Sequence, residues 1–182
     1  MRRALVVSAV TFGLICSHGY AAAQTKHPSQ KWPTVFAPEV ELGFENARPP
    51  SDAVLDALMK SPEVSETGDD DKKPDRESVR KSFQAVPVVL GGTNEEDYIV
   101  LGGGEYTGAD CHWFWIVRVR HGVAEVLLFS NGLALELRKH GTNGYRDIHV
   151  SWATAAYIGE RSYSYDGSAY KLVREQAKEQ KP

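Results

Sequence analysis

From Ala85 onward the hydrophobic pattern of this chain has a period of two and is interrupted every few residues by turn-forming sequences. Alternation of apolar and polar residues indicates a half-buried β-strand, and about eight segments show it with no crossover helix between them. We therefore predict a mainly β domain, an antiparallel sandwich or small barrel of about eight strands. The predicted strands are 85–90, 97–102, 111–120, 123–129, 133–139, 146–152, 158–165 and 168–173.

Two of these segments carry the clearest information about burial. The segment 111–120 contains the run His-Trp-Phe-Trp-Ile-Val, which is apolar on both faces and predicts a strand buried on both sides. Trp115 is therefore expected in the core. The segment 133–139 alternates regularly, which places Leu133, Leu135 and Leu137 on the inner face.

Two short helices are predicted ahead of the strands. Ser51 is an N-cap candidate for a helix over 52–60, and Asp75 is one for a helix over 76–84. We divide the chain into a proline-rich and acidic lead-in with one short helix (24–75), a β-rich domain (76–174) and a charged tail expected to fray (175–182).

The first 23 residues are typical of a secretory signal peptide. Arg2 and Arg3 precede an apolar run over 4–15, and three alanines end at Ala23. The run is shorter than the roughly 20 residues of a transmembrane helix. We predict a periplasmic or secreted protein. Cys16 leaves open the alternative of a lipid anchor.

Charge and cysteine content narrow the possible partners. Removing Arg2 and Arg3 from 21 basic residues, against 24 acidic ones, leaves the mature chain with a net charge of −5. This balance disfavours nucleic acid and anionic membranes. Cys111 is the single cysteine after residue 23, so an internal disulfide is excluded, and we expect it to be a small buried residue.

Catalytic candidates are weak. Asp147, His149 and Ser151 share one strand face, but residues two apart on a strand lie about 6.5 Å apart, too far for direct side-chain hydrogen bonds. Glu105 and Asp110 form a possible carboxylate pair on one loop. The histidines lack the spacing of a zinc site, so we predict no metal of that kind.

Binding candidates are aromatic and acidic. The loop that holds Glu105, Tyr106 and Asp110 combines an aromatic ring with two carboxylates, as recognition surfaces do. Tyr163 and Tyr165, near the last hairpin, are a second candidate surface if they line an exposed sheet face.

The run Thr142-Asn143-Gly144-Tyr145-Arg146-Asp147-Ile148 resembles the loop-to-strand element of FG-GAP-like secreted bacterial β-domains, and 88–100 resembles a second, degraded copy. In that family such loops hold calcium. The resemblance implies a turn at Asn143 and Gly144 with Asp147 as a possible weak calcium ligand. Most other ligand positions of the family are not acidic or amide residues here, and calcium needs six to eight oxygens. The group also resembles invertebrate-type lysozyme inhibitors and immunity proteins.

These observations favour an exported, non-enzymatic binding protein whose partner is a protein, possibly one that inhibits or gives immunity against a lysozyme-like cell-wall hydrolase. Two alternatives stay open. One is an exported hydrolase that uses Asp147, His149 and Ser151, or Glu105 and Asp110. The other is a structural envelope protein. The sequence leaves the oligomeric state undetermined.

Overall fold

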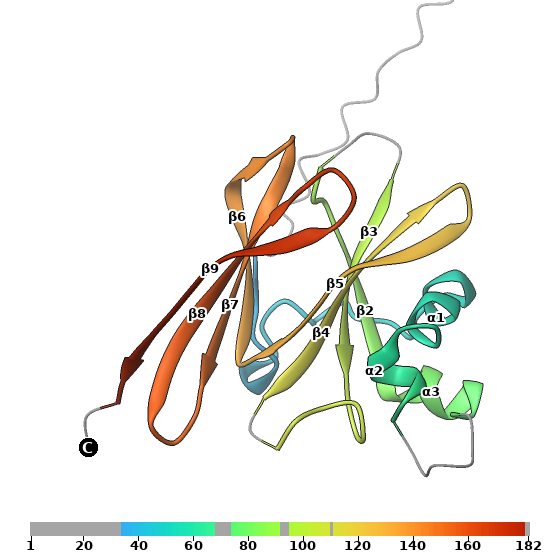
Figure 1. The fold of residues 1–182 in the computed structure, drawn as a ribbon. Coiled ribbons are helices and arrows are strands. Elements are labelled where there is room, and N and C mark those ends of the chain that lie inside the picture. The colour runs from blue at the N-terminus through green and yellow to red at the C-terminus, as the bar shows by residue number, and fades with distance from the viewer. Residues whose placement is uncertain (1–33, 68–73, 92–94, 110, 181–182) are drawn as a thin grey trace, which may run out of the picture. The chain divides into compact units, whose positions relative to one another are not determined.

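A computed structural model describes residues 34–67, 74–91, 95–109 and 111–180, and shows two antiparallel sheets packed as a β-sandwich (Figure 1). One sheet has the order β1-β6-β7-β8-β9 and the other the order β2-β3-β4-β5. The predicted mainly β class and the sandwich are confirmed. The strands are β1 (Val35–Phe36), β2 (Phe83–Val88), β3 (Glu96–Gly102), β4 (His112–Arg120), β5 (Val123–Gly132), β6 (Ala134–Thr142), β7 (Tyr145–Ala153), β8 (Tyr157–Tyr165) and β9 (Tyr170–Glu179).

The topology follows from the short turns of the sequence. From β2 to β5 and from β6 to β9, each strand pairs with the next strand along the chain. The chain changes sheet at Leu133, whose N–H donates to the Ser151 carbonyl at 2.7 Å. The short β1, the first strand along the chain, lies at the edge of the five-stranded sheet next to β6, where Val35 pairs with Glu136.

The main core lies between the two sheets, because the inner faces of both are apolar. Leu135 and Leu137 lie there as predicted, whereas Leu133 is half-buried at the crossing. Strand β4 is buried on both faces from Phe114 to Arg118, which confirms its prediction. Other members of the core include Phe36, Val86, Ile99, Ile116, Leu128, Ile148, Val150, Tyr163 and Tyr165.

Three short helices cover the outer face of the four-stranded sheet (Figure 1). They are α1 (Asp52–Leu58), α2 (Pro62–Ser65) and α3 (Arg76–Ser82). Trp115 is fully buried in this second core, where its ring centroid lies 5.2 Å from that of Phe83 and 5.0 Å from that of Phe129. The predicted core position of Trp115 is confirmed.

The caps of α1 and α3 are as predicted. The Ser51 hydroxyl accepts the Val54 N–H at 3.4 Å, and the Asp75 carboxylate accepts the Ser78 N–H at 2.9 Å. Each satisfies an N–H group that the helix itself leaves free. The additional turn α2 was not predicted, although it begins with Pro62, a residue favoured at the first helical position.

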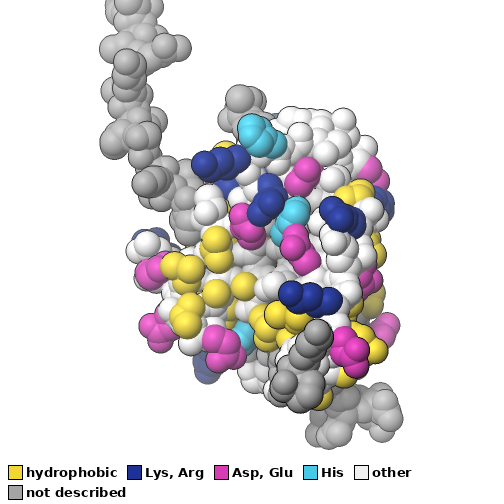
Figure 2. Space-filling view, turned by 90° about the vertical axis from the view of Figure 1, so that its left-hand side faces the viewer, with side chains coloured by type: hydrophobic (Ala, Val, Ile, Leu, Met, Phe, Trp, Pro, Cys, Tyr) yellow, Lys and Arg dark blue, Asp and Glu magenta, His cyan; other side chains and the backbone are white. Residues whose placement is uncertain are grey.

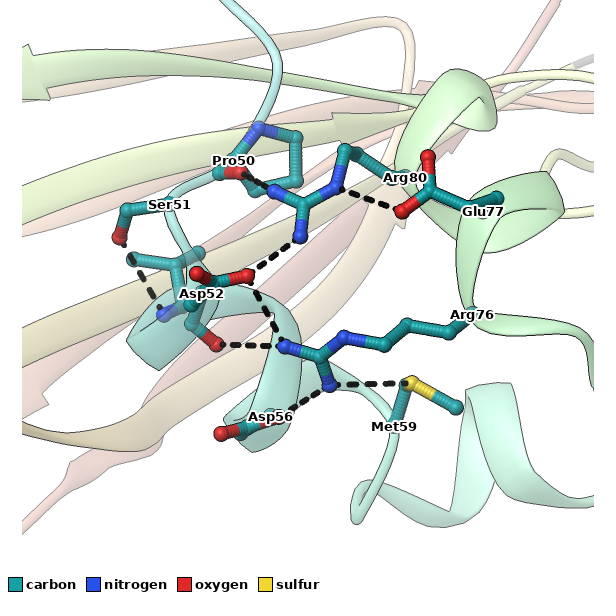
Figure 3. A network of polar contacts seen from close by, with 9 residues as sticks. Pro50, Ser51, Asp52, Asp56, Met59, Arg76, Glu77 and Arg80 are labelled. Atoms are coloured by element: carbon teal, nitrogen blue, oxygen red, sulfur yellow. Dashed lines mark hydrogen bonds and ion pairs between the residues drawn. The ribbon is translucent and has the colours of Figure 1, made fainter.

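Ion pairs join α1 to α3 (Figure 3). Arg76 contacts Asp52 at 3.1 Å and also pairs with Asp56, while Arg80 pairs with Asp52 and donates to the Pro50 carbonyl at 2.7 Å. These side chains are partly exposed, so each pair contributes modestly to stability. The network links α1 to α3, while buried apolar side chains such as Leu55 and Leu58 pack α1 against the sheet.

The predicted frayed tail is wrong for most of its length. Strand β9 continues to Glu179 and pairs along β8, with Arg161 opposite Glu175 and their side chains 2.9 Å apart. The charged residues that suggested a solvated tail instead belong to an edge strand, where charges discourage pairing with another chain. The strand structure therefore extends beyond residue 174, to Glu179.

Several predictions concern residues outside the described part of the chain, namely the signal peptide over 1–23, Cys16, the acidic residues 69–71 of the lead-in and Asp110. Within the described part of the chain, every helix is too short or too polar to cross a membrane.

Candidate functional site

A groove runs along β5 at the edge of the four-stranded sheet and has a volume of about 510 Å³. Strand β5 pairs with β4 on one side, and among the described residues no strand pairs with its other side. One wall is the end of α1 and the start of α2, and the other is the start of β9. The floor is the edge of β5 over residues 124–129.

The register of β5 on β4 determines which side chains meet each wall. Val126 lies opposite Val117, and Phe129 lies opposite Trp115, so both face the helices and meet Ala57 there. Leu127 and Leu128 belong to the core between the sheets. The strand edge at the floor of the groove therefore lies between two apolar layers, one under the helices and one between the sheets.

Charged side chains stand along both walls of the groove. Lys60 and Glu63 belong to the helical wall, Lys171 to the opposite wall and Glu125 to β5 itself. The signs balance, so the groove carries no strong field of either sign. Selectivity for an occupant therefore depends on shape, backbone hydrogen bonds and apolar contacts more than on net charge.

The β5 edge differs from the other three sheet edges. Strand β1 has two residues, β2 carries Pro87 and is bridged by Arg48 at Ala85, and β9 carries charged residues at half of its positions. These are the means by which proteins protect a strand edge. Strand β5 is ten residues long and has Glu125 as its single charged residue. A bulge at Leu127 interrupts its register with β4, but β5 carries neither the proline of β2 nor the dense charge of β9.

A buried ion cluster joins the two sheets. Arg118 on β4 is fully buried, and its Nε lies 2.8 Å from Asp97 and 3.0 Å from Glu95. Its Nη1 donates to the Tyr165 hydroxyl at 3.1 Å, and its guanidinium lies 4.4 Å from the centre of the Tyr145 ring. Because Tyr145 and Tyr165 belong to β7 and β8, the cluster fixes the spacing between the sheets.

The environment moves the two carboxyl groups in opposite directions. Burial raises the pKa of Asp97, although Arg118 acts against it. Partial burial also acts to raise the pKa of Glu95, but the Tyr145 hydroxyl and the guanidiniums of Arg120 and Arg118 outweigh burial and leave that pKa lowered. Sequence analysis missed this cluster, because the pattern of β4 indicates burial but not the ionic partner of Arg118.

Figure 2 shows side chains of both charges and histidines on the side of the five-stranded sheet, together with a cluster of hydrophobic side chains. Asp147, His149 and Ser151 do not meet there as a triad. His149 pairs with Glu160 on β8, and the Ser151 hydroxyl donates to the Ala134 carbonyl at 3.4 Å. The long spacing along one strand is the physical reason.

The predicted binding tyrosines are not surface residues. Tyr106 is fully buried against Phe83, with their ring centroids 4.8 Å apart, and burial raises its pKa to about 12. Tyr163 and Tyr165 lie in the core between the sheets. The expectation of an exposed aromatic surface is therefore wrong for all three. Glu105 is exposed.

The predicted turn is present at Asn143 and Gly144, which both have positive φ and connect β6 to β7. The Asn143 amide donates to the Tyr165 carbonyl at 2.9 Å, and one carboxylate oxygen of Asp147 is buried without a hydrogen-bond partner among the described residues. The described part of the chain contains no cluster of three potential acidic, histidine or cysteine metal ligands. Cys111 is half-buried with a free thiol.

Comparison of the chain with protein-family models, with curated proteins and with solved structures finds no match. The resemblance to FG-GAP-like domains and to lysozyme inhibitors therefore stays a prediction.

Proposed function

We propose that this protein is an exported, non-enzymatic binding domain that holds an extended segment of a partner protein in the groove along β5. The observation that supports the proposal is the ten-residue, nearly uncharged β5 edge at the floor of a groove with two walls. Free N–H and C=O groups on a strand edge are a template for another strand. An extended peptide is the ligand whose own backbone groups match them.

The shape of the groove favours a single inserted strand. The edge of β5 is recessed between the helical wall and the start of β9. A second recessed edge of the same kind cannot approach it closely, whereas a lone extended segment fits between the walls. Its alternate side chains would contact Val126 and Phe129 on one side and the region of Tyr170 on the other.

The class of partner comes from the sequence. We propose that residues 1–23 act as a secretory signal peptide and that the protein works in the periplasm or outside the cell, where cell-wall hydrolases are available as targets. We propose a lysozyme-like hydrolase as the partner and inhibition or immunity as the outcome. Inhibition of a panel of muramidases by the mature protein tests this finer proposal, and no inhibition and no complex with any of them would contradict it.

The site itself is tested with a displayed library of random linear peptides. We expect the mature protein to select peptides with alternating apolar residues. Val126→Lys, inside the groove, should lose at least about tenfold in affinity, since a lysine on a strand edge opposes pairing. Val123→Lys is the matched control, because Val123 lies on the same strand outside the groove and is 72% exposed.

Glu125→Lys provides a second variant that leaves the apolar core intact, because Glu125 is exposed. Melting temperatures show that each variant is folded. If Val126→Lys, Glu125→Lys and the wild type bind the selected peptides with equal affinity, the peptides bind outside the groove. That result would contradict the groove as the binding site.

A further inference from the structure

The chain contains two Asn-Gly pairs in different structural settings. Asn143 and Gly144 form the exposed turn between β6 and β7, with φ values of 54° and 79°. Asn131 and Gly132 end β5, where they pair with Trp113 and His112 of β4. The same dipeptide therefore occurs once in a turn and once inside a sheet.

Asparagine followed by glycine has a defined reaction in water. The glycine backbone nitrogen attacks the side-chain Cγ of asparagine, a C–N bond forms, and the amide nitrogen leaves as ammonia. Water then opens the resulting succinimide ring to aspartate or isoaspartate. The reaction needs local backbone rotation, and glycine offers the least steric resistance to it.

The surroundings of the two glycines differ in the space they leave. No heavy atom would lie within 4 Å of a Cβ added to Gly144, whereas a Cβ on Gly132 would lie 2.4 Å from the Ser151 carbonyl oxygen. Gly132 is buried, so the backbone there cannot rotate without opening the sheet.

We infer that Asn143 is a site of succinimide-mediated deamidation in the folded protein and that folding protects Asn131. The modification has a structural consequence. The Asn143 Nδ2–H donates to the Tyr165 carbonyl at 2.9 Å and joins the β6–β7 turn to the end of β8. A carboxylate has no hydrogen to donate there, so conversion removes this link.

Isoaspartate changes the turn further, because the chain then runs through the side-chain carbons and the connection becomes longer. The next residue, Tyr145, donates its hydroxyl to Glu95 at 2.9 Å beside Arg118. Deamidation at Asn143 therefore loosens the segment that carries one partner of the buried ion cluster.

Peptide mass mapping tests the inference. The mature protein is incubated in mildly alkaline buffer, once folded and once in concentrated urea, and both Asn-Gly peptides are followed over time. Unfolding exposes both sites alike. We expect the rate at Asn143 to differ within a few-fold between the two conditions, and the rate at Asn131 to fall at least about tenfold on folding, because that reaction requires local opening.

Two further variants complete the test. Asn143→Gln should stop the early mass change of that peptide, and Asn143→Asp, which copies one product, should melt at a lower temperature than the wild type. The inference is overturned if Asn131 reacts as fast as Asn143 in the folded protein, or if folding protects Asn143 as strongly as Asn131. An unchanged melting temperature of Asn143→Asp would contradict the role of the Tyr165 contact.

Discussion

Arg118 on β4 and Asp97 on β3 are cross-strand partners in the four-stranded sheet and form a buried ion pair, with the Arg118 Nε 2.8 Å from the Asp97 Oδ1 and both side chains almost completely buried. Taking two charges out of water is costly, and their attraction offsets that cost only while both are present. Removing either residue should therefore destabilise the packing of β3 and β4 against the second sheet.

Arg118→Met should lower the free energy of unfolding by about 3–5 kcal/mol, because it leaves Asp97 buried and unpaired. The double variant Arg118→Met with Asp97→Asn should recover part of the lost free energy of unfolding, since an uncharged amide costs less to bury than a carboxylate. Urea denaturation of the two single variants and the double variant measures the coupling. Additive losses would show that the two residues do not interact as described.

Trp115→Ala should cost about 3–5 kcal/mol, the range of large-to-small changes in a core. Trp115 is fully buried under the helices, where it contacts Phe83 and Phe129. Val123→Ala is the control, since exposed positions usually change stability within about 0.5 kcal/mol. Thermal melting measures both. A variant that melts like the wild type would contradict the burial of Trp115.

Asp166 gives the fold a defined response to acid. Hydrogen bonds from the N–H groups of Ala169 and Ser168, and from the Ser168 hydroxyl, lower the pKa of Asp166 from 3.8 to about 2. A lowered pKa means that the charged form stabilises the folded state above the unfolded pKa, and that this contribution is lost as pH falls through the folded pKa. We expect the loss between about pH 4 and pH 2.

The comparison variant is Asp166→Asn, which keeps an acceptor oxygen but does not titrate. The stability difference between wild type and variant should shrink as the pH falls through this window. An NMR titration of the Asp166 carboxyl measures the pKa directly, and an ordinary value near 3.8 would contradict the turn geometry.

The Asn143–Asp147 segment should behave as a structural turn. The described part of the chain has no cluster of three acidic, histidine or cysteine side chains, whereas calcium requires six to eight oxygen ligands. We expect the melting temperatures of the wild type and of Asp147→Asn each to be the same in millimolar calcium and in chelator. A wild-type melting temperature that rises by several degrees with calcium, and fails to rise in Asp147→Asn, would establish a metal site.

Local pattern was sufficient for most of the fold. Period-two alternation identified the strands from β2 to β8, and the capping residues Ser51 and Asp75 marked the starts of α1 and α3. The end of β9 was missed because a solvated edge strand and a frayed tail have the same charged composition. What separates them is pairing with β8, a long-range property that no local pattern carries.

The candidate site was harder to predict than the strands, because it is formed by segments that lie far apart in the sequence. The β5 segment is an edge only because the chain changes sheet at Leu133, and the helical wall of the groove comes from residues more than sixty positions earlier. Tyr106 lies in a glycine-rich loop that indicates exposure, yet its ring is buried against Phe83. Neither fact follows from the residues near it in sequence.

Amide hydrogen exchange shows directly whether an extended segment of another protein pairs with β5. The measurement compares the mature protein alone and with a peptide selected from the random linear library. We expect exchange to slow at alternate amides of residues 124–129, which gain backbone partners, while the amides of β9 beyond the groove wall, over residues 172–179, are unchanged. Protection that falls on β9 or on the outer face of the five-stranded sheet, with β5 unaffected, would contradict this pairing.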